Sequence, residues 1–188
     1  MKTFPLFLKL AGRRVLLVGG GHVAASKLSA LLEAGARVTV VAPRIGAELE
    51  RPDVDLVRRA FRPTDLVGCW FVVVAATAEV AREVAEAATE RCIFVNAADD
   101  AETASAYLGS VVRRAGVTLA ISTGGSAPAL AALLREGLET LLPLDLEEWM
   151  ATARSLRQRW REESVPTGMR RPLLLRALDE LYAARRTA

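Results

Sequence analysis

The architecture of this chain is indicated most clearly by one stretch, Val15-Leu-Leu-Val-Gly-Gly-Gly-His-Val-Ala-Ala25. An apolar run ends in Gly19-x-Gly21-x-x-Ala24 and a helical pattern follows at once, which predicts a strand, a tight glycine turn and a helix. The first glycine permits the turn, the second lets the backbone approach a ligand, and the small Ala24 lets the helix pack close to the strand. Because the N–H groups that open a helix attract anions, the turn predicts a dinucleotide site with the pyrophosphate at the helix N-terminus.

Helical and strand patterns alternate after this turn. We expect a helix over Ala25–Ala34 with Gly35 at its C-terminal cap. The β-α-β alternation indicates an α/β fold with a Rossmann-type, doubly wound parallel sheet. Its further strands are expected at Arg37–Val41, Val54–Arg58, Trp70–Ala76 and Ile93–Asn96, with a helix from Thr77 to about Arg91.

The pattern changes after about Asp100. A strand is expected at Val117–Ser122, followed by a Gly-Gly turn and a helix over Ala127–Leu141 that Ser126 caps. The remainder is predicted to be helical, with Val165–Gly168 as the linker to the last helix. The apolar positions of these two helices are Leu146, Trp149, Ala153, Leu156 and Trp160 in the first, and Leu174, Leu178 and Leu181 in the second.

These patterns divide the chain into three expected parts. Residues 1–112 form a dinucleotide-binding Rossmann domain, and residues 145–188 form a C-terminal helical domain. Residues 113–144 connect these two parts and have more apolar side chains than a segment at the edge of the fold needs. We therefore expect this part to be the dimerisation segment of a two-fold homodimer. Its apolar side chains are Leu130, Leu133, Leu134, Leu138, Leu141 and Leu142.

Composition and charge narrow the classes of protein. The 188 residues are 52% hydrophobic, enough for a sizeable core, yet no apolar stretch is long enough to span a membrane. A net charge of +3 does not by itself indicate a nucleic-acid partner. Met1–Leu10 lacks the pattern of a secretory signal and is expected to be extended and to cover the sheet. Cys69 and Cys92 form no disulfide or metal pattern, so we expect buried free thiols in a cytoplasmic protein.

The choice between NAD and NADP stays open on the residues alone. The second strand ends in Val41-Ala42-Pro43-Arg44, without the acid that binds the adenosine ribose in many dinucleotide folds. Either another residue contacts the ribose, or Arg44 receives the 2′-phosphate of NADP. His22, the only histidine, lies inside the glycine turn, which favours a position at the cofactor edge over catalysis. A metal site built from several histidines is excluded, and no metal is expected.

Two further turns follow predicted strands, where open α/β sheets place their ligand crevice. Asn96-Ala-Ala-Asp-Asp100 offers Asp99 or Asp100 as a base or as a ligand for positive charge, although Asp is also common in solvated turns. Ser122-Thr-Gly-Gly-Ser126 offers backbone N–H groups to an anion, although an ordinary capped turn has the same residues.

Several motifs also occur together in a recognisable order. They are Phe4-Pro-Leu-Phe-Leu-x-Leu10, Val18-Gly-Gly-Gly-x-Val-Ala-x-x-Lys27, Val40-Val-Ala-Pro43, Phe94-Val-Asn96 followed by Asp99, and Ile121-Ser-Thr-Gly-Gly-Ser-x-Pro-Ala-Leu130. This order resembles the precorrin-2 dehydrogenase / sirohydrochlorin ferrochelatase family, whose modules act in sirohaem synthesis. The resemblance runs from Phe4 to about Pro143, and the helical remainder fits the family's third part.

The resemblance implies an NAD-dependent enzyme that dehydrogenates precorrin-2, a tetrapyrrole, to sirohydrochlorin. It implies NAD as the cofactor and Asp99 as the catalytic residue. It also points to a homodimer. Resemblance and residue patterns together give the expected positions for the cofactor as Gly19, Gly20, Gly21, His22, Val23, Ala24, Pro43, Arg44 and Thr77, and those for the substrate pocket as Asn96, Ser122, Thr123 and Gly124.

The chain departs from the family pattern at a few positions. Ala97-Ala98 stand where bulkier aliphatic residues are usual, and Ala106 and Gly109 stand where Phe and Pro are common. Two alternatives to a simple dehydrogenase stay open. One is a bifunctional enzyme that also inserts iron, and the other is a non-catalytic NAD-binding regulatory module. Because no uroporphyrinogen methyltransferase domain follows, we expect a stand-alone module.

Overall fold

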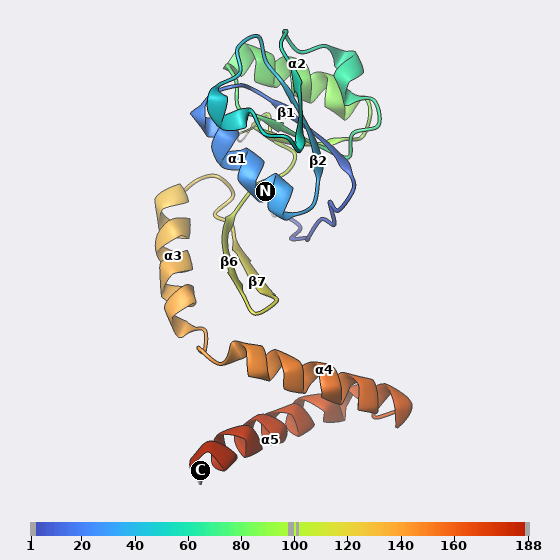
Figure 1. Cartoon of the computed structure of the whole chain (residues 1–188), viewed down its shortest axis with the longest axis vertical. Coiled ribbons are helices and arrows are strands. Elements are labelled where there is room, and N and C mark those ends of the chain that lie inside the picture. The colour runs from blue at the N-terminus through green and yellow to red at the C-terminus, as the bar shows by residue number, and fades with distance from the viewer. Residues whose placement is uncertain (1–2, 98–99, 101, 187–188) are drawn as a thin grey trace. The chain divides into compact units, whose positions relative to one another are not determined.

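The chain forms two compact units in the computed structural model, which describes residues 3–97, 100 and 102–186 (Figure 1). The first unit comprises Met1–Leu108 together with Gly124–Ser126. The second comprises Gly109–Thr123 together with Ala127–Ala188.

The first unit is built on a five-stranded parallel sheet, which confirms the expected Rossmann-type architecture. The strand order β3-β2-β1-β4-β5 reverses direction between β1 and β4. In open α/β sheets such a reversal opens a ligand crevice at the carboxyl ends of the strands. The strands are β1 (Arg14–Val18), β2 (Arg37–Val41), β3 (Val54–Val57), β4 (Phe71–Val74) and β5 (Phe94–Ala97).

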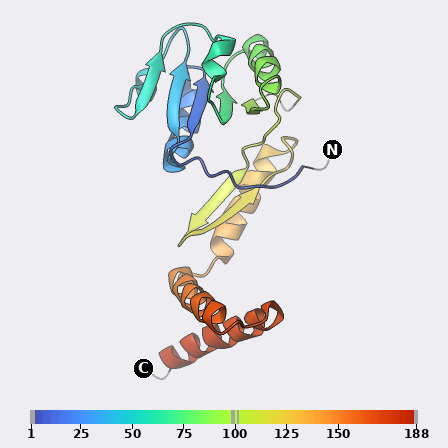
Figure 2. The same cartoon turned by 90° about the vertical axis from the view of Figure 1, so that its right-hand side faces the viewer.

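Both faces of the sheet are buried, because alternate side chains of each central strand enter different cores. Leu16 and Val72 belong to the core that α2 (Ala78–Thr89) covers. Leu17 and Val73 belong to the opposite core, which α1 (His22–Glu33) covers. Figure 2 shows the two helices on opposite faces of the sheet.

Helix α1 begins at His22, three residues earlier than expected, because Gly21 itself is the N-cap. The glycine turn therefore leads directly into the first helical turn. The expected C-terminal cap is confirmed: Gly35 has a φ of +74° and donates its N–H to the Leu32 carbonyl at 2.8 Å. The N–H of Ala36 reaches back to the Leu31 carbonyl at 3.1 Å, which completes a Schellman motif.

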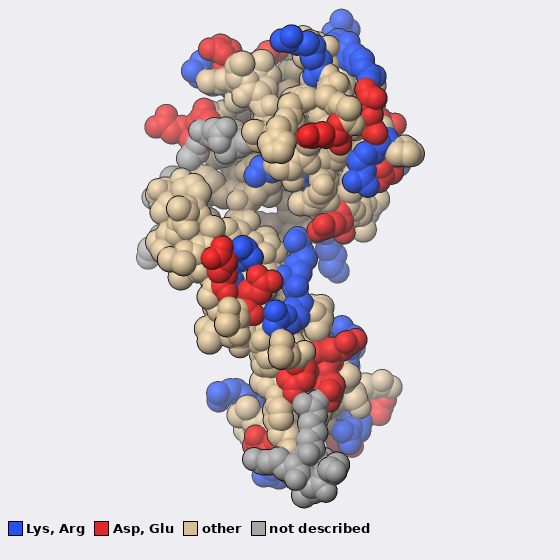
Figure 3. All heavy atoms as spheres, turned by 60° about the vertical axis from the view of Figure 1, so that its left-hand side comes forward, with Lys and Arg blue, Asp and Glu red and all other residues tan. Residues whose placement is uncertain are grey.

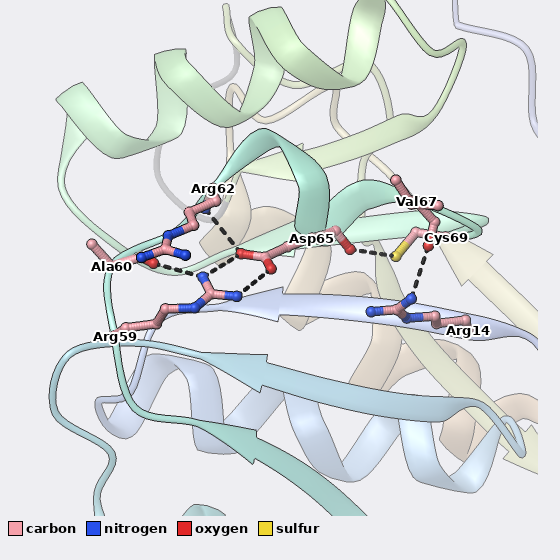
Figure 4. A network of polar contacts seen from close by, with 7 residues as sticks. All are labelled: Arg14, Arg59, Ala60, Arg62, Asp65, Val67 and Cys69. Atoms are coloured by element: carbon pink, nitrogen blue, oxygen red, sulfur yellow. Dashed lines mark hydrogen bonds and ion pairs between the residues drawn. The ribbon is translucent and has the colours of Figure 1, made fainter.

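No α-helix covers the crossover from β3 to β4, which instead contains a short 3₁₀ helix, η2 (Pro63–Leu66). The buried carboxylate of Asp65 accepts two hydrogen bonds from the Arg59 guanidinium, at 2.8 and 2.6 Å, and one from the backbone N–H of Arg62 at 2.9 Å (Figure 4). These bonds, that from Arg59 foremost, hold the pKa of the Asp65 carboxyl below its usual range. The ion pair thus fixes a crossover that has few helical hydrogen bonds of its own.

Two expectations for the first unit are wrong. The N-terminal segment does not bury its aromatic side chains: Phe4 and Phe7 are 85% and 70% exposed, and Leu10 alone of residues 3–10 packs into the core. Cys92 is exposed, because it occupies the left-handed turn position (φ +54°) just after α2. Cys69 is buried as expected.

The second unit begins with an antiparallel hairpin that the sequence patterns did not reveal in full. Its second strand, β7 (Val117–Ile121), was expected, whereas its first, β6 (Ser110–Arg114), was not. Ala115 and Gly116 both have positive φ, as the type I′ turn of a two-residue hairpin requires. Helix α3 (Pro128–Leu141) packs against this hairpin.

The start of α3 differs from the expectation, because its N-cap is Ala127 and not Ser126. The backbone N–H of Ala127 donates to the Thr123 hydroxyl at 3.2 Å, which ties the start of α3 to the preceding turn, and among the described residues no side chain caps the helix. Pro128 occupies the first turn as expected.

Two long helices, α4 (Leu146–Glu162) and α5 (Thr167–Arg186), complete the second unit and pack on each other. Helix α5 begins inside the stretch expected to be a linker. The expected apolar faces are confirmed, since Leu146, Leu156, Trp160 and Leu178 are buried. Within the described part of the chain, no helix is both long and apolar enough to cross a membrane. Acidic and basic side chains are interspersed over the face drawn in Figure 3.

Candidate functional site

The three glycines of the first turn have different surroundings. A Cβ atom on Gly19 (φ +132°) would lie 2.1 Å from the carbonyl oxygen of Ala75, and one on Gly20 would lie 1.8 Å from that of Arg44. A Cβ atom on Gly21 would meet nothing within 4 Å. The protein's own backbone thus requires the first two glycines, whereas Gly21 borders open space at the start of α1.

A hollow of about 360 Å³ lies in front of this turn. We call it the glycine hollow. One side is the turn itself and the first residue of α1, where N–H groups without helical partners favour an anion. The other side is the loop after β2, which continues into the 3₁₀ helix η1 (Ala47–Leu49). The lining residues are Gly20, Gly21, His22, Gly46, Ala47, Glu48 and Leu49.

A second hollow, of about 220 Å³, lies at the carboxyl ends of β4 and β5. We call it the strand-end hollow. Small apolar side chains make up most of its wall, which suits a flat ring. The lining residues are Val23, Val74, Ala75, Ala76, Ala78, Ala81, Ala97 and Asp100.

The two hollows flank the start of α1, since His22 lines one and Val23 the other. This division suits a ligand with two nucleoside halves joined by an anionic pyrophosphate at the helix N-terminus. Gly21 leaves the backbone open to that pyrophosphate. The residues present therefore fit a nicotinamide dinucleotide. No group of His, Cys, Asp and Glu that could hold a metal ion occurs in the ranges that the structure describes.

The remaining residues proposed for the cofactor lie around the two hollows rather than in their walls. Ala24 is fully buried beneath the turn. Pro43 and Arg44 are exposed, and the Arg44 carbonyl packs against Gly20. Thr77 is the N-cap of α2, between two alanines of the strand-end hollow.

Asp100 lies at the strand-end hollow and is tied into its own turn. Its carboxylate accepts hydrogen bonds from the Thr103 hydroxyl, from the Thr103 N–H at 3.1 Å and from the Glu102 N–H at 3.0 Å. These bonds, the Thr103 hydroxyl foremost, lower the pKa of the Asp100 carboxyl and favour its ionised form. Asp99, the residue expected to be catalytic, lies outside the described residues.

Asn96 is buried on β5 and is not among the residues that line either hollow. Its amide nitrogen donates to the Ala106 carbonyl at 3.0 Å, while its Oδ1 accepts no hydrogen bond from the described residues. The Ser105 hydroxyl accepts the N–H of Val95 at 2.8 Å. Asn96 and Ser105 thus fasten the returning segment of chain along β5.

The other residues proposed for the substrate lie in the turn before α3. Ser122 is exposed, the Thr123 hydroxyl accepts the N–H of Ala127, and Gly124 adopts a left-handed φ of +63°. Ser122 and Thr123 belong to the second unit, whereas Gly124 belongs to the first.

Sequence reasoning missed Glu48, whose carboxylate lines the glycine hollow. The acid that binds the ribose was expected directly after the second strand, where Pro43 and Arg44 stand. The available signal was an acid in the short stretch Gly46-Ala47-Glu48-Leu49, between the second and third strands.

Fold and hollows together define a dinucleotide-binding α/β protein of the Rossmann type. The chain belongs to the family described as putative NAD(P)-binding, which matches residues 6–110. Residues 116–141 match the central region of sirohaem biosynthesis proteins, so the resemblance expected from the motifs is confirmed.

Siroheme synthases are similar to this chain over most of its length. Siroheme synthase 3 of Aeromonas hydrophila is 42% identical over 176 residues, covering 91% of this chain and 38% of that protein. Siroheme synthase of Citrobacter koseri is 41% identical over the same shares of the two chains. The chain thus spans about two fifths of the length of these relatives. The solved structure "SirC, precorrin-2 dehydrogenase" matches with a TM-score of 0.74 at 26% identity, covering 96% of this chain and 92% of that one.

Proposed function

We propose that this protein is an NAD-dependent dehydrogenase that converts precorrin-2 to sirohydrochlorin in sirohaem biosynthesis. The observation that carries the proposal is the glycine turn between two hollows, in a chain that matches a precorrin-2 dehydrogenase over nearly its whole length. The similarity to siroheme synthases supports the same pathway.

The reaction removes two electrons and two protons from the macrocycle. Bound NAD⁺ supplies the hydride acceptor, and the second proton leaves to a base. We assign that base to Asp99, which takes the proton or orients the macrocycle through hydrogen bonds to pyrrole N–H groups. Gly20, Gly21 and the start of α1 would hold the pyrophosphate of the cofactor, and the apolar wall of the strand-end hollow would shield its nicotinamide from water. Asn96, Ser122, Thr123 and Gly124 are assigned to the substrate side.

NAD is the cofactor that we propose, because the glycine hollow, as the described residues line it, includes the carboxylate of Glu48 and neither lysine nor arginine. Pro43 and Arg44 complete its adenosine side, behind Gly20. The second candidate activity is iron insertion into sirohydrochlorin, which the similarity to siroheme synthases supports. A non-catalytic NAD-binding module is the remaining alternative.

We further propose a homodimer formed through β7 and α3. Four leucines on α3 are at least 46% exposed, and they recur at helical spacing along one face, which supports an interface there. They are Leu130, Leu133, Leu134 and Leu141. Light scattering at micromolar concentration should give the mass of a dimer, and Leu133→Glu should give a monomer. A wild-type monomer contradicts this assembly.

The three functional parts that we propose are residues 1–112, 113–144 and 145–188. The family matches at 6–110 and 116–141 support the first two. Free thiols at Cys69 and Cys92 support a reducing compartment such as the cytoplasm.

The test is an anaerobic reaction of precorrin-2 with NAD⁺ and the purified protein, followed by NADH and sirohydrochlorin absorbance. We expect both products. A parallel reaction with Fe²⁺ tests the second activity, because sirohaem forms only if the protein also inserts iron. Binding of NAD⁺ without either product would favour the regulatory module.

A further inference from the structure

Among the described residues that line the glycine hollow, Glu48 alone has a carboxylate. It stands opposite the helix N-terminus and belongs to η1, seven residues beyond the end of β2 at Val41. The usual position for an acid in this fold, directly after β2, is taken by Ala42 and Pro43. The chain therefore presents its acid from a different element on the same side of the site.

The backbone fixes this unusual placement. The N–H of Gly46 donates to the carbonyl of Gly20 at 2.9 Å, which fastens the loop after β2 to the glycine turn. A Cβ atom on Gly46 would lie 3.3 Å from that carbonyl, so a side chain there would crowd the contact. Directly after Glu48, the fully buried Leu49 anchors η1 in the core beneath α1.

The side chain itself points across the hollow toward the start of α1. The Oε2 atom of Glu48 lies 3.4 Å from Nδ1 of His22, the first residue of the helix. The structure thus holds the Glu48 carboxylate next to a helix N-terminus that favours an anion. A ligand that satisfies both has a pyrophosphate followed by a neutral group rich in hydroxyl donors.

We propose that Glu48 is the residue that selects the adenosine ribose: it accepts hydrogen bonds from the ribose hydroxyls and repels a 2′-phosphate. This inference rests on the proposed dinucleotide site. A phosphate on the 2′-hydroxyl would bring a second negative charge against the carboxylate, and like charges at close range disfavour binding. Because the Glu48 side chain is 65% exposed, water screens part of this repulsion.

The test measures binding, without any turnover. Calorimetric titrations of the whole chain use ADP-ribose and 2′-phospho-ADP-ribose, which lack the nicotinamide ring. The wild type should bind ADP-ribose more tightly by about tenfold or more, the scale of a like-charge contact near the surface. Glu48→Gln should shrink this ratio severalfold, and Glu48→Lys should reverse the preference.

The matched control is Glu50→Gln. Glu50 lies two residues further on, pairs with Arg58 at the surface and does not line the hollow. This variant removes the same charge and should leave the ratio unchanged. Melting curves test whether each variant is folded. We expect all of them to fold, because the side chains of Glu48 and Glu50 are both exposed.

The outcomes separate the two levels of the proposal. If the wild type binds ADP-ribose and Glu48→Gln leaves the ratio unchanged, the role of Glu48 is wrong while the dinucleotide site stands. An equal shift in Glu50→Gln would also overturn it, because net charge alone would then explain the preference. If the wild type binds neither compound, the dinucleotide site itself is wrong.

Discussion

A Cβ atom on Gly20 would lie 1.8 Å from the carbonyl oxygen of Arg44, whereas one on the adjacent Gly21 would meet no atom within 4 Å. The first contact joins the glycine turn to the loop after β2, and the second position faces open space beside α1. Neighbouring glycines in one motif thus differ in what requires them: the fold itself excludes a side chain at Gly20, whereas at Gly21 only a ligand would.

Substitution should separate these two requirements. Gly20→Ala is expected to lower the free energy of unfolding by about 2 kcal/mol or more, because backbone must move to admit the methyl group. Gly21→Val should remain folded and lose NAD⁺ binding, because its branched side chain would occupy the space of the pyrophosphate. Urea unfolding and calorimetric titration of both variants provide the measurements. Unchanged NAD⁺ affinity in Gly21→Val contradicts the assigned site.

Asp65 should make stability depend on pH. Its folded pKa is lowered, foremost by the hydrogen bonds from Arg59, so the ionised form stabilises the folded chain. This contribution is complete above the unfolded pKa of about 4 and is lost as pH falls through the folded pKa. Asp65→Asn should cost about 2 kcal/mol at pH 7, the scale of hydrogen bonds to a charged group.

Below about pH 4 the difference in unfolding free energy between wild type and Asp65→Asn should shrink. Asp53→Asn is the control, because the exposed Arg51–Asp53 pair should contribute less than about 1 kcal/mol. A difference between wild type and Asp65→Asn that is constant from pH 7 to pH 3 would remove the ion pair as its cause.

Cys92 offers a stabilising substitution. Its φ of +54° is unfavourable for a residue with a Cβ atom, and it ends α2 in the position that glycine usually takes. The Ile93 N–H donates to the Ala88 carbonyl at 3.0 Å across this turn. Cys92→Gly should raise the free energy of unfolding by about 0.5–1 kcal/mol relative to Cys92→Ala, which keeps the Cβ atom. Equal stability of the two variants in urea would show that the strain is negligible.

Asp99→Asn should retain the fold and NAD⁺ affinity but lower turnover by about 10²-fold or more, the scale for losing a positioned acid–base group. Asp100→Asn should change turnover far less and mainly loosen its own turn, since Thr103 and Glu102 bond to that carboxylate. Steady-state NADH formation from precorrin-2 measures both. A larger loss of turnover in Asp100→Asn would move the catalytic assignment to that residue.

The sequence patterns predicted the first unit well, because glycine turn, buried strands and helix caps are local signals that agree with one another. They missed β6 because only part of Ser110–Arg114 is buried, so the strand has no clear apolar alternation. They missed Glu48 because its place depends on the Gly46–Gly20 hydrogen bond, which joins residues far apart in sequence. The start of α3 was also misplaced by one residue, since its N-cap is Ala127, whose N–H is held by the Thr123 hydroxyl, and not Ser126.

The central claim is that precorrin-2 gives its hydride to a nicotinamide cofactor held at Gly21. The most direct measurement is the ratio of NADH to sirohydrochlorin formed from precorrin-2 and NAD⁺ without oxygen, in the wild type and in Gly21→Val. We predict one NADH for each sirohydrochlorin in the wild type and neither product above background in the variant. Sirohydrochlorin without NADH, or equal rates in the two proteins, would contradict the account.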